Sequence, residues 1–254
     1  MVCADPLALA DWQLSRDRKA TGRFAGLFEH KIDRMAASPL AYLRGAAPLF
    51  YRLLAQAPAL SEGPGGKGWL CGDAHLENFG AFRTEDGVAF DINDFDEATI
   101  GPWRVDVLRL ATSVMLAGRE LGADGRRRIA LSRALLDSYV RHAFEASRMP
   151  APPPPVAALL GQVKRRSHHE LLAERTESTG DRRRFVRDRR YQELSKRQAR
   201  AARAAFDRYA RRLASGEPPR CFEVLDVAFR LAGTGSLGCL RVAVLTRGSG
   251  GSDG

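Results

Sequence analysis

The sequence has no long run of apolar residues. Its first eighteen residues include Asp5, Asp11 and Asp17 and show none of the unbroken apolar core that a secretory signal peptide carries. No window approaches the ~18 apolar residues that a membrane-spanning helix needs. The four cysteines form no CxxC pair and no Cys/His spacing typical of a zinc site. We therefore predict a cytoplasmic protein, in a reducing compartment, with no membrane partner.

Lysine is scarce, and most of the basic excess lies in one stretch. Of the 40 basic residues 35 are Arg, and the formal net charge is +10. Residues 181–212 alone hold twelve Arg and one Lys against four acidic residues. A nucleic-acid or phosphorylated partner is one interpretation of this segment, but its arginines do not alternate with aromatic residues as a base-stacking surface requires. We favour an amphipathic helix whose arginine stems cover apolar surface.

The length and the hydrophobic pattern predict a mixed fold. A chain of 254 residues, 44% of them hydrophobic, can form one large domain or two lobes around a cleft. Helical spacing of apolar residues predicts helices over 24–35, 39–56, 105–121, 126–147, 156–174 and 190–215. Strand-like patterns cover 69–71, 88–92, 223–231 and 239–246, and a polar segment without regular structure is expected around 178–184. The predicted fold class is therefore α+β.

The segment from Gly72 to Ala98 carries the residues best suited to chemistry. Asp73 and Asn78 stand five positions apart on one loop, which is the spacing of a catalytic base and a metal-binding amide in kinases. A strand that ends in an Asp-aromatic-acid run follows, and it supplies Asp94, with Asp96 two residues on, as carboxylate ligands. Mg²⁺ prefers such hard oxygen ligands, so this pattern predicts phosphoryl transfer with ATP and Mg²⁺.

An ordinary structural explanation exists for each motif alone, because Asp and Asn are common in turns. The order of the two motifs, with a strand between them and a helix after them, favours function. The acidic residues also crowd together within sixteen positions, at Asp91, Asp94, Asp96, Glu97 and Asp106. They would repel one another unless a cation neutralised them. Arg104 and Arg109 are the local candidates for that role, and Mg²⁺ is the stronger one.

A glycine pattern near the end of the chain predicts a phosphate-binding loop. Gly233, Gly235 and Gly238 form G-x-G-x-x-G, with Ser236 inside it. A dinucleotide-binding fold needs a helix directly after such a loop, whereas residues 239–246 are apolar and strand-like. Strand, glycine loop and strand instead resemble the hairpin that covers ATP phosphates in kinases. A flexible hairpin turn with surplus glycine remains the alternative.

Four motifs together resemble a known family. They are SPLAYLRG (Ser38–Gly45), GDAHLENFG (Gly72–Gly80), FDINDFDEA (Phe90–Ala98) and GPWRVDVLRLATS (Gly101–Ser113). The set is similar to the bacterial family called domain of unknown function 2252. More distantly, GDxHxxN followed by the Asp-aromatic-acid strand is similar to the aminoglycoside phosphotransferase and choline kinase group. The close resemblance covers most of residues 23–115 and returns at 223–247.

The resemblance implies a role for each polar residue. Asp73 would be the catalytic base, and Asn78 and Asp94 the metal ligands. Asp106 would brace the catalytic loop through backbone N–H groups, and His75 would orient that loop, although a purely structural histidine is an equal interpretation. The wider group usually has a histidine where this chain has Cys71.

The order of the motifs implies a permuted kinase-like fold. In kinases the glycine loop precedes the catalytic loop, but here it follows Asp73 by about 160 residues. We expect a mostly helical catalytic lobe over 1–215, an incomplete nucleotide-lobe hairpin over 220–247 and a disordered tail over 248–254. In kinases a strand with the lysine that pairs with the phosphates follows the glycine loop. No Lys follows Gly238 here, because the last one in the chain is Lys196. We expect a truncated and impaired phosphotransferase of unknown acceptor, and the alternatives are a non-catalytic pseudoenzyme or binding protein and an Arg-rich nucleic-acid-binding protein.

Overall fold

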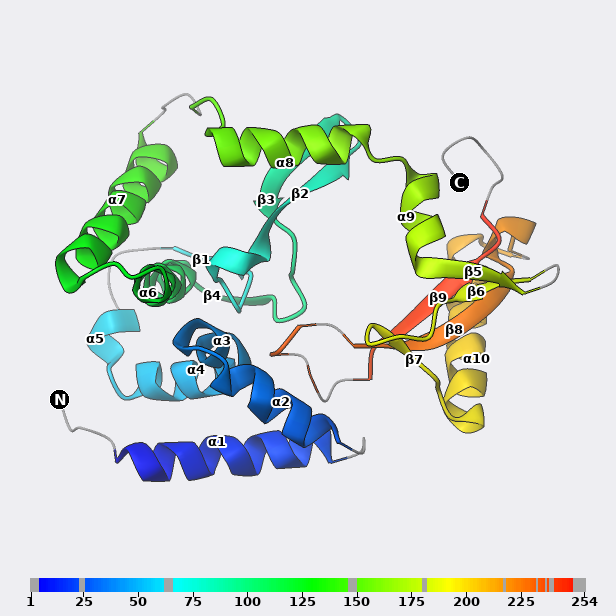
Figure 1. The fold of residues 1–254 in the computed structure, drawn as a ribbon, viewed down its shortest axis with the longest axis horizontal. Coiled ribbons are helices and arrows are strands. Elements are labelled where there is room, and N and C mark those ends of the chain that lie inside the picture. Colours follow the sequence, from blue (N-terminus) through cyan, green and yellow to red (C-terminus); the bar gives the residue numbers. More distant parts are fainter. Residues whose placement is uncertain are drawn as a thin grey trace. The chain divides into compact units, whose positions relative to one another are not determined.

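The computed structural model describes residues 5–22, 26–61, 66–145, 150–179, 182–216, 218–231, 233–235, 237 and 240–248. The helices are α1 (Pro6–Thr21), α2 (Leu27–Ala36), α3 (Pro39–Gly45), α4 (Ala47–Ala55), α5 (Pro58–Ser61), α6 (Arg104–Glu120), α7 (Gly125–Phe144), α8 (Pro154–Arg165), α9 (His168–Arg175), α10 (Lys196–Leu213), and the short η1 (Leu76–Asn78) and η2 (Arg220–Phe222) (Figure 1). The strands are β1 (Lys67–Leu70), β2 (Phe79–Thr84), β3 (Gly87–Ile92), β4 (Thr99–Pro102), β5 (Thr176–Thr179), β6 (Arg182–Phe185), β7 (Tyr191–Gln192), β8 (Val224–Arg230) and β9 (Val242–Thr246). This confirms the predicted α+β class. Every helix in the described ranges is too short or too polar to cross a lipid bilayer.

The chain divides into two compact units. Unit 1 comprises Met1–Lys164 together with Thr234–Gly238, and unit 2 comprises Arg165–Gly233 together with Cys239–Gly254. The predicted domain bounds 1–215 and 220–247, which were based on the motifs, differ from the bounds of these two units. Helix α10 groups with the C-terminal strands because it packs against β8. Of the expected tail, residues 249–254 lie outside the described part of the chain.

Unit 1 begins with four helices that pack around a small apolar cluster. Met35, Ala46 and Leu49 form the buried part of this cluster. The structure has two helices, α3 and α4, where a single helix over 39–56 was predicted, and that prediction was wrong. The chain breaks at Ala46 (φ −110°, ψ 31°), and α4 begins there with Pro48 near its start. A proline lacks the N–H for a continuous helix and its ring clashes with the preceding turn.

The strands of unit 1 position the loops that carry the acidic residues. Strand β1 pairs antiparallel with β4, and β2 pairs antiparallel with β3, so the chain leaves the end of β1, forms the β2–β3 hairpin and returns at Thr99, opposite Leu70. Leu54, Leu70 and Val105 are buried together and join α4, β1 and the first turn of α6. The segment between β1 and β2 is thereby held against the start of α6.

Unit 2 is a three-stranded antiparallel sheet in the order β7-β8-β9, with the β5–β6 hairpin and α10 beside β8. The rings of Phe185 and Tyr191 stack with centroids 4.5 Å apart, over Ala228 and Leu245. The β5–β6 hairpin replaces the unstructured segment expected around 178–184, so that expectation was wrong for its described residues.

Two helix boundaries were also wrong, and capping boxes explain both. Ser167 and Glu170 cap the start of α9, which divides the helix predicted over 156–174. Ser195 and Gln198 cap α10 in the same way, so this helix begins at Lys196 and not at residue 190. In each box the serine and the third residue of the helix satisfy each other's backbone N–H groups.

A buried ion pair holds the sheet of unit 2 to its hairpin. Asp226 on β8 accepts hydrogen bonds from Arg187 Nη1 (2.8 Å) and Nη2 (3.0 Å) and from the main-chain N–H of Phe185 (2.9 Å). Burial has the largest single effect and opposes ionisation of this carboxyl, but the hydrogen bonds and charge of Arg187, with the N–H groups of Phe185 and Val227, together lower the pKa of Asp226. Removing this carboxylate would leave the Phe185 N–H without its acceptor and would leave Arg187 with Glu193 as its other acidic partner.

We therefore predict that Asp226→Ala weakens unit 2 by about 2 kcal/mol, because it leaves the buried N–H of Phe185 without an acceptor and takes from Arg187 the more buried of its two acidic partners. Hydrogen-exchange mass spectrometry on peptides from β5 to β8 measures the loss. Glu177→Ala is the matched control, since its ion pair with Arg184 is largely exposed and should matter far less. Equal protection in the two variants would show that the Asp226 contacts do not stabilise the sheet.

Candidate functional site

The loop between β1 and η1 folds sharply at Gly72. This residue has φ +84°, and a side chain there would overlap the main-chain oxygen of Glu97. The Tyr51 hydroxyl donates a hydrogen bond to the Gly72 carbonyl oxygen from the other side. Only glycine fits both the left-handed conformation and the close approach of the second loop. Gly72 therefore brings the loop of Asp73 against the loop that carries Glu97.

Asp106 fixes the same loop from the first turn of α6. Its Oδ2 accepts a hydrogen bond from Cys71 N (2.6 Å) and its Oδ1 accepts one from Gly72 N (3.2 Å). These are the backbone contacts that the family resemblance implied for Asp106. The thiol of Cys71 is buried, and burial raises its pKa. The anchoring therefore comes from Asp106 and not from a side chain at position 71.

Asp73 lies at the centre of the site and is ion-paired. Its Oδ1 accepts hydrogen bonds from Arg109 Nε (2.7 Å) and Nη2. Arg109 has no exposed surface, donates from Nη2 to the Leu43 carbonyl oxygen (2.9 Å) and stacks its guanidinium 5.0 Å above the ring of Phe50. Burial raises the pKa of Asp73, while the charge of Arg109 opposes that rise. One carboxylate oxygen is thus held in place and Oδ2 is left for another partner.

His75 faces the remaining oxygen of Asp73. Its Nε2 lies 3.7 Å from Asp73 Oδ2. Burial, followed by the charges of Arg44 and Arg109, lowers the pKa of His75 to about 4. The imidazole is therefore neutral at pH 7, and it cannot compete with Arg109 as a charged partner for the carboxylate.

Asn78 connects the two acidic loops. Its Nδ2 donates to the Asp73 carbonyl oxygen (2.7 Å), which leaves the amide oxygen unused by this contact. Its own carbonyl oxygen accepts from Asn93 N (2.9 Å). Asp94 follows Asn93 directly in the chain. This hydrogen bond therefore ties the loop of Asp94 to Asn78, the other predicted metal ligand.

Asp94 is half-buried and acts electrostatically on the loop of Asp73. Its charge adds to the rise that burial causes in the pKa of Asp73, and it opposes the fall that burial causes in the pKa of His75. The Asp94 Oδ1 accepts a hydrogen bond from Asp96 N at 3.3 Å, whereas the side chain of Asp96 is exposed. Within the described ranges no group of three His, Cys, Asp or Glu residues is close enough to hold a metal ion. A cation here would therefore need the Asn78 amide oxygen, and other oxygens such as phosphate or water, besides Asp94.

Part of the glycine loop lies against Asp73. A Cβ atom on Gly235 would stand 3.4 Å from Asp73 Oδ2 and 3.0 Å from the carbonyl oxygen of Arg44. Gly233 has φ +64°. Ser236 and Gly238, which the sequence also nominates, lie outside the described residues. The described part of the loop therefore borders the free oxygen of the candidate base.

Several buried nitrogen atoms around Asp73 have no hydrogen-bond partner within the described ranges. They are His75 Nδ1, Arg44 Nε and Arg109 Nη1. Buried polar atoms are nearly always satisfied in folded proteins, so a cluster of exceptions is typical of a site that binds a polar ligand. Arg44 and Glu77 form an ion pair here, and neither was assigned a role from the sequence. Both stand inside the quoted motifs, and that position was the signal available.

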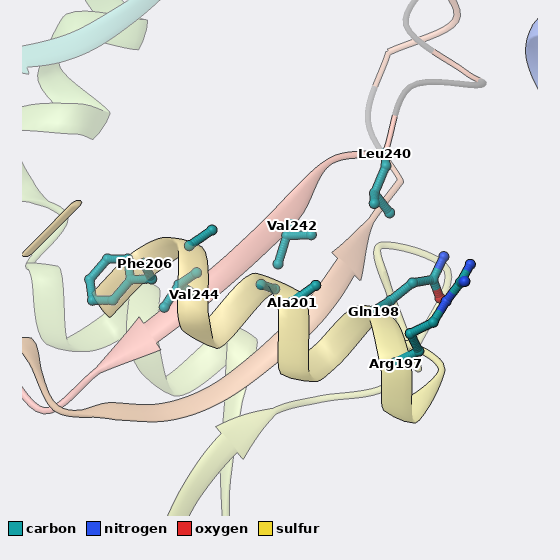
Figure 2. Close-up of a pocket in the computed structure, with 9 residues that line it drawn as sticks. Arg197, Gln198, Ala201, Phe206, Leu240, Val242 and Val244 are labelled. Atoms are coloured by element: carbon teal, nitrogen blue, oxygen red, sulfur yellow. The ribbon is translucent and has the colours of Figure 1, made fainter. Parts of the chain in front are cut away.

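An apolar groove lies elsewhere, in unit 2. It measures about 690 Å³ and lies between α10 and β9 of unit 2. Figure 2 shows Ala201 and Phe206 of α10 opposite Val242 and Val244 of β9, with Arg197 at one end. No acidic residue is among its described lining residues, so it holds no pair of groups that could move a proton. The site around Asp73 is therefore the better place for chemistry.

The arginines of α10 are used at least partly for packing. Arg203 donates from Nη1 to the carbonyl oxygen of Val224 (3.0 Å), which joins the helix to β8. Ala210 is the buried residue of this helix, and the rest of its surface carries exposed arginines and alanines. This arrangement agrees with the amphipathic interpretation, and the nucleic-acid interpretation of 181–212 stays an untested alternative.

Comparison with known proteins gives one match. A family model described as "Uncharacterized protein conserved in bacteria (DUF2252)" matches residues 23–253. No curated protein and no solved structure matches the chain. The matched range includes both acidic loops, the whole of unit 2 apart from its last residue, and the glycine loop.

We predict that Gly72→Ala destabilises unit 1 at least about 2 kcal/mol more than Gly122→Ala does. Both glycines have nearly the same positive φ, but the space around Gly122 is open, whereas Gly72 touches Glu97. The difference in unfolding free energy between the two variants therefore excludes the cost of the backbone conformation, and it measures the cost of the steric overlap with Glu97. Urea unfolding followed by the fluorescence of Trp12, Trp69 and Trp103, all in unit 1, measures both. Equal losses would mean that the two loops do not touch at Gly72.

We also predict that acid weakens unit 1 through His75. The pKa of His75 is about 4 in the folded chain and about 6.5 in an unfolded one. The unfolded state therefore takes up the proton first, and stability is lost as the pH falls below 6.5. The expected loss between pH 8 and pH 5 is about 2 kcal/mol. The same urea experiment measures it, and His75→Gln should abolish this part of the pH dependence; an unchanged dependence would exclude a buried neutral histidine.

Proposed function

The chain belongs to the bacterial protein family DUF2252, and from that premise we propose that it is a kinase-like phosphotransferase that uses ATP and Mg²⁺ to phosphorylate a hydroxyl group. The observation that carries the proposal is the arrangement of Asp73. One of its oxygens is held by Arg109 and the other faces Gly235. Such a carboxylate is suited to orient a hydroxyl group and to accept its proton. The acceptor itself is not identified.

Each residue around Asp73 would have a separate role in this reaction. Oδ2 of Asp73 would accept a hydrogen bond from the acceptor hydroxyl and take its proton as the acceptor oxygen bonds to the γ-phosphorus of ATP. The bond between that phosphorus and the bridging oxygen of ADP would break in the same transfer, and ADP would leave with the electron pair. Arg109 keeps the carboxylate oriented, and the neutral His75 packs beside it without adding a charge. Asp106 keeps the whole loop on α6 through its two backbone hydrogen bonds. Catalysis would then rest on positioning more than on covalent chemistry by the protein.

The residues present are suited to Mg²⁺. The Asn78 amide oxygen and the Asp94 carboxylate are hard ligands from adjacent loops, joined by the hydrogen bond between Asn93 N and Asn78 O. Asp96 would contribute from the exposed rim. A bound Mg²⁺ would supply positive charge to offset the charge of the transferred phosphoryl group. It would also lower the repulsion among the acidic side chains around Asp94.

A non-catalytic binding protein with the same fold is the second candidate. The observation that favours it is the ion pair of Asp73 with the buried Arg109. Burial raises the pKa of Asp73, but an arginine so close opposes that rise, and it therefore limits the strength of Asp73 as a base. On this interpretation nucleotide would bind and no phosphoryl transfer would follow.

Titration calorimetry with ATP, in Mg²⁺ and in EDTA, tests the proposal. We predict Mg²⁺-dependent ATP binding that Asp94→Asn weakens roughly 10-fold or more, because one metal ligand loses its charge. Asp86→Asn, on the exposed β2–β3 turn, is the matched control and should bind as the parent chain does. Equal weak heats from all three proteins would contradict the assignment of the metal ligands.

Labelled ATP separates the enzyme from the binding protein. Transfer of the γ-phosphoryl group to water or to a panel of sugars and amino alcohols should be abolished by Asp73→Asn, while Mg·ATP binding persists. Binding without any transfer in the parent chain would favour the non-catalytic candidate.

A further inference from the structure

The groove between α10 and β9 in unit 2 has room for a ligand. Its volume is about 690 Å³, within the range of ~300–1,000 Å³ that small-molecule sites occupy. Its walls are apolar side chains of both elements, namely Ala201, Ala205 and Phe206 of α10 and Val242 and Val244 of β9. A ligand that fills this space must be apolar along its length, because the walls give a polar group no hydrogen-bond partner.

One end of the groove is positively charged. Figure 2 shows Arg197 and Gln198 at this end and Phe206 at the other. Arg197 is exposed and lies in the first turn of α10, which holds no acidic residue. The positive end of the helix dipole adds to the charge of this arginine. The groove is therefore asymmetric, with a basic end and an apolar end.

Gln198 adds a second donor at the basic end, because the start of α10 fixes the orientation of its amide. Its Oε1 accepts hydrogen bonds from Ser195 N (3.0 Å) and from Ser195 Oγ (2.7 Å), within the capping box of the helix. The amide oxygen is thus in use, and the N–H groups of Nε2 are left for a ligand. A guanidinium group and an amide donor together favour an anionic head group.

We propose that the groove binds a single-chain amphiphile with an anionic head, such as a medium- or long-chain fatty acid. The head accepts hydrogen bonds from Arg197 and Gln198, and the hydrocarbon chain lies between α10 and β9 toward Phe206. A free fatty acid and an alkyl phosphate share this chemistry, and the experiment distinguishes them. The site is independent of the proposed phosphoryl transfer, because its residues belong to unit 2 and Asp73 belongs to unit 1.

Titration calorimetry on the full chain tests the proposal without any substitution. The probes are octanoate, decanoate and dodecanoate, each below its critical micelle concentration. Affinity should rise about 3-fold with each added methylene group, because each one leaves water for the groove. Decan-1-ol has the same chain as decanoate without the charge, and it should bind roughly 10-fold more weakly. Affinity that does not change with chain length, or that is equal for decanoate and decan-1-ol, would overturn the proposal.

Decyl phosphate identifies the head group. Tighter binding of decyl phosphate than of decanoate would assign the site to a phosphorylated chain, and the reverse order would assign it to a free fatty acid.

Two tryptophan variants test the place of the chain. Ala205→Trp puts a large side chain into the groove and should weaken decanoate binding more than roughly 10-fold. Ala204→Trp is the matched control, because Ala204 is the neighbouring residue of the same helix, is exposed and does not line the groove. Circular dichroism of both variants checks that α10 persists. Equal losses of affinity in the two variants would place the ligand outside the groove.

Substitutions at the basic end test the place of the head. Arg197→Gln should weaken binding of decanoate roughly 10-fold and leave that of decan-1-ol unchanged. Gln198→Glu should act in the same direction, because a glutamate keeps the capping box while its carboxylate repels the anion. Arg208→Gln, also exposed on α10 but not in the groove lining, is the control. Equal losses for decanoate and decan-1-ol would contradict this placement of the head.

A second copy of the chain is the rival occupant of an apolar groove. Sedimentation equilibrium distinguishes it from a small ligand. We expect Ala205→Trp and the parent chain to have the same oligomeric state. A parent dimer that Ala205→Trp dissociates would assign the groove to a second copy and overturn the ligand site.

Discussion

The buried ion pair between Arg109 and Asp73 is the constraint on which the candidate site depends. Arg109 has no exposed surface, and its donors join the loop of Asp73 to the end of α3 through Asp73 and the Leu43 carbonyl oxygen. A buried cation without its anion costs several kcal/mol, so the loop cannot move away from α6 without a large loss. The same contact leaves one oxygen of Asp73 for a ligand. Asp73 therefore holds its loop in place and, in the proposed reaction, also acts on the substrate. Hydrogen bonds to the side chains of Asp106 and Ser113 attach the same loop to α6.

Charge is distributed unevenly around that carboxylate. Arg109 and Arg44 supply positive charge to Asp73, and Asp94 and Glu97, from the loop after β3, supply negative charge. A phosphate group bound with Mg²⁺ has the complementary character, because its oxygens can face the guanidinium groups while the cation faces the acids.

The sequence predicted the local features of this site and missed most of the long-range ones. The spacing of Asp73 and Asn78 indicated a shared loop, and the hydrogen bond between their atoms agrees with it. Arg109 was expected to neutralise the acidic cluster of residues 91–106, but it pairs with Asp73, thirty-six residues away, because burial and not sequence distance decides its partner. The break at Pro48 and the capping boxes at Ser167 and Ser195 are local signals that could have been used. The β5–β6 hairpin could not be predicted, because it depends on Asp226, forty-one residues from Phe185.

The central claim is that Asp73, Asn78 and Asp94 face one phosphate-and-metal site. A crystal structure of the chain with Mg²⁺ and a non-hydrolysable ATP analogue tests it most directly. The account predicts one Mg²⁺ ligated by the Asn78 amide oxygen and the Asp94 carboxylate at about 2.1 Å, with Asp73 Oδ2 open toward the terminal phosphate. A nucleotide bound instead in the apolar groove between α10 and β9, or a metal without contact to either residue, would contradict it.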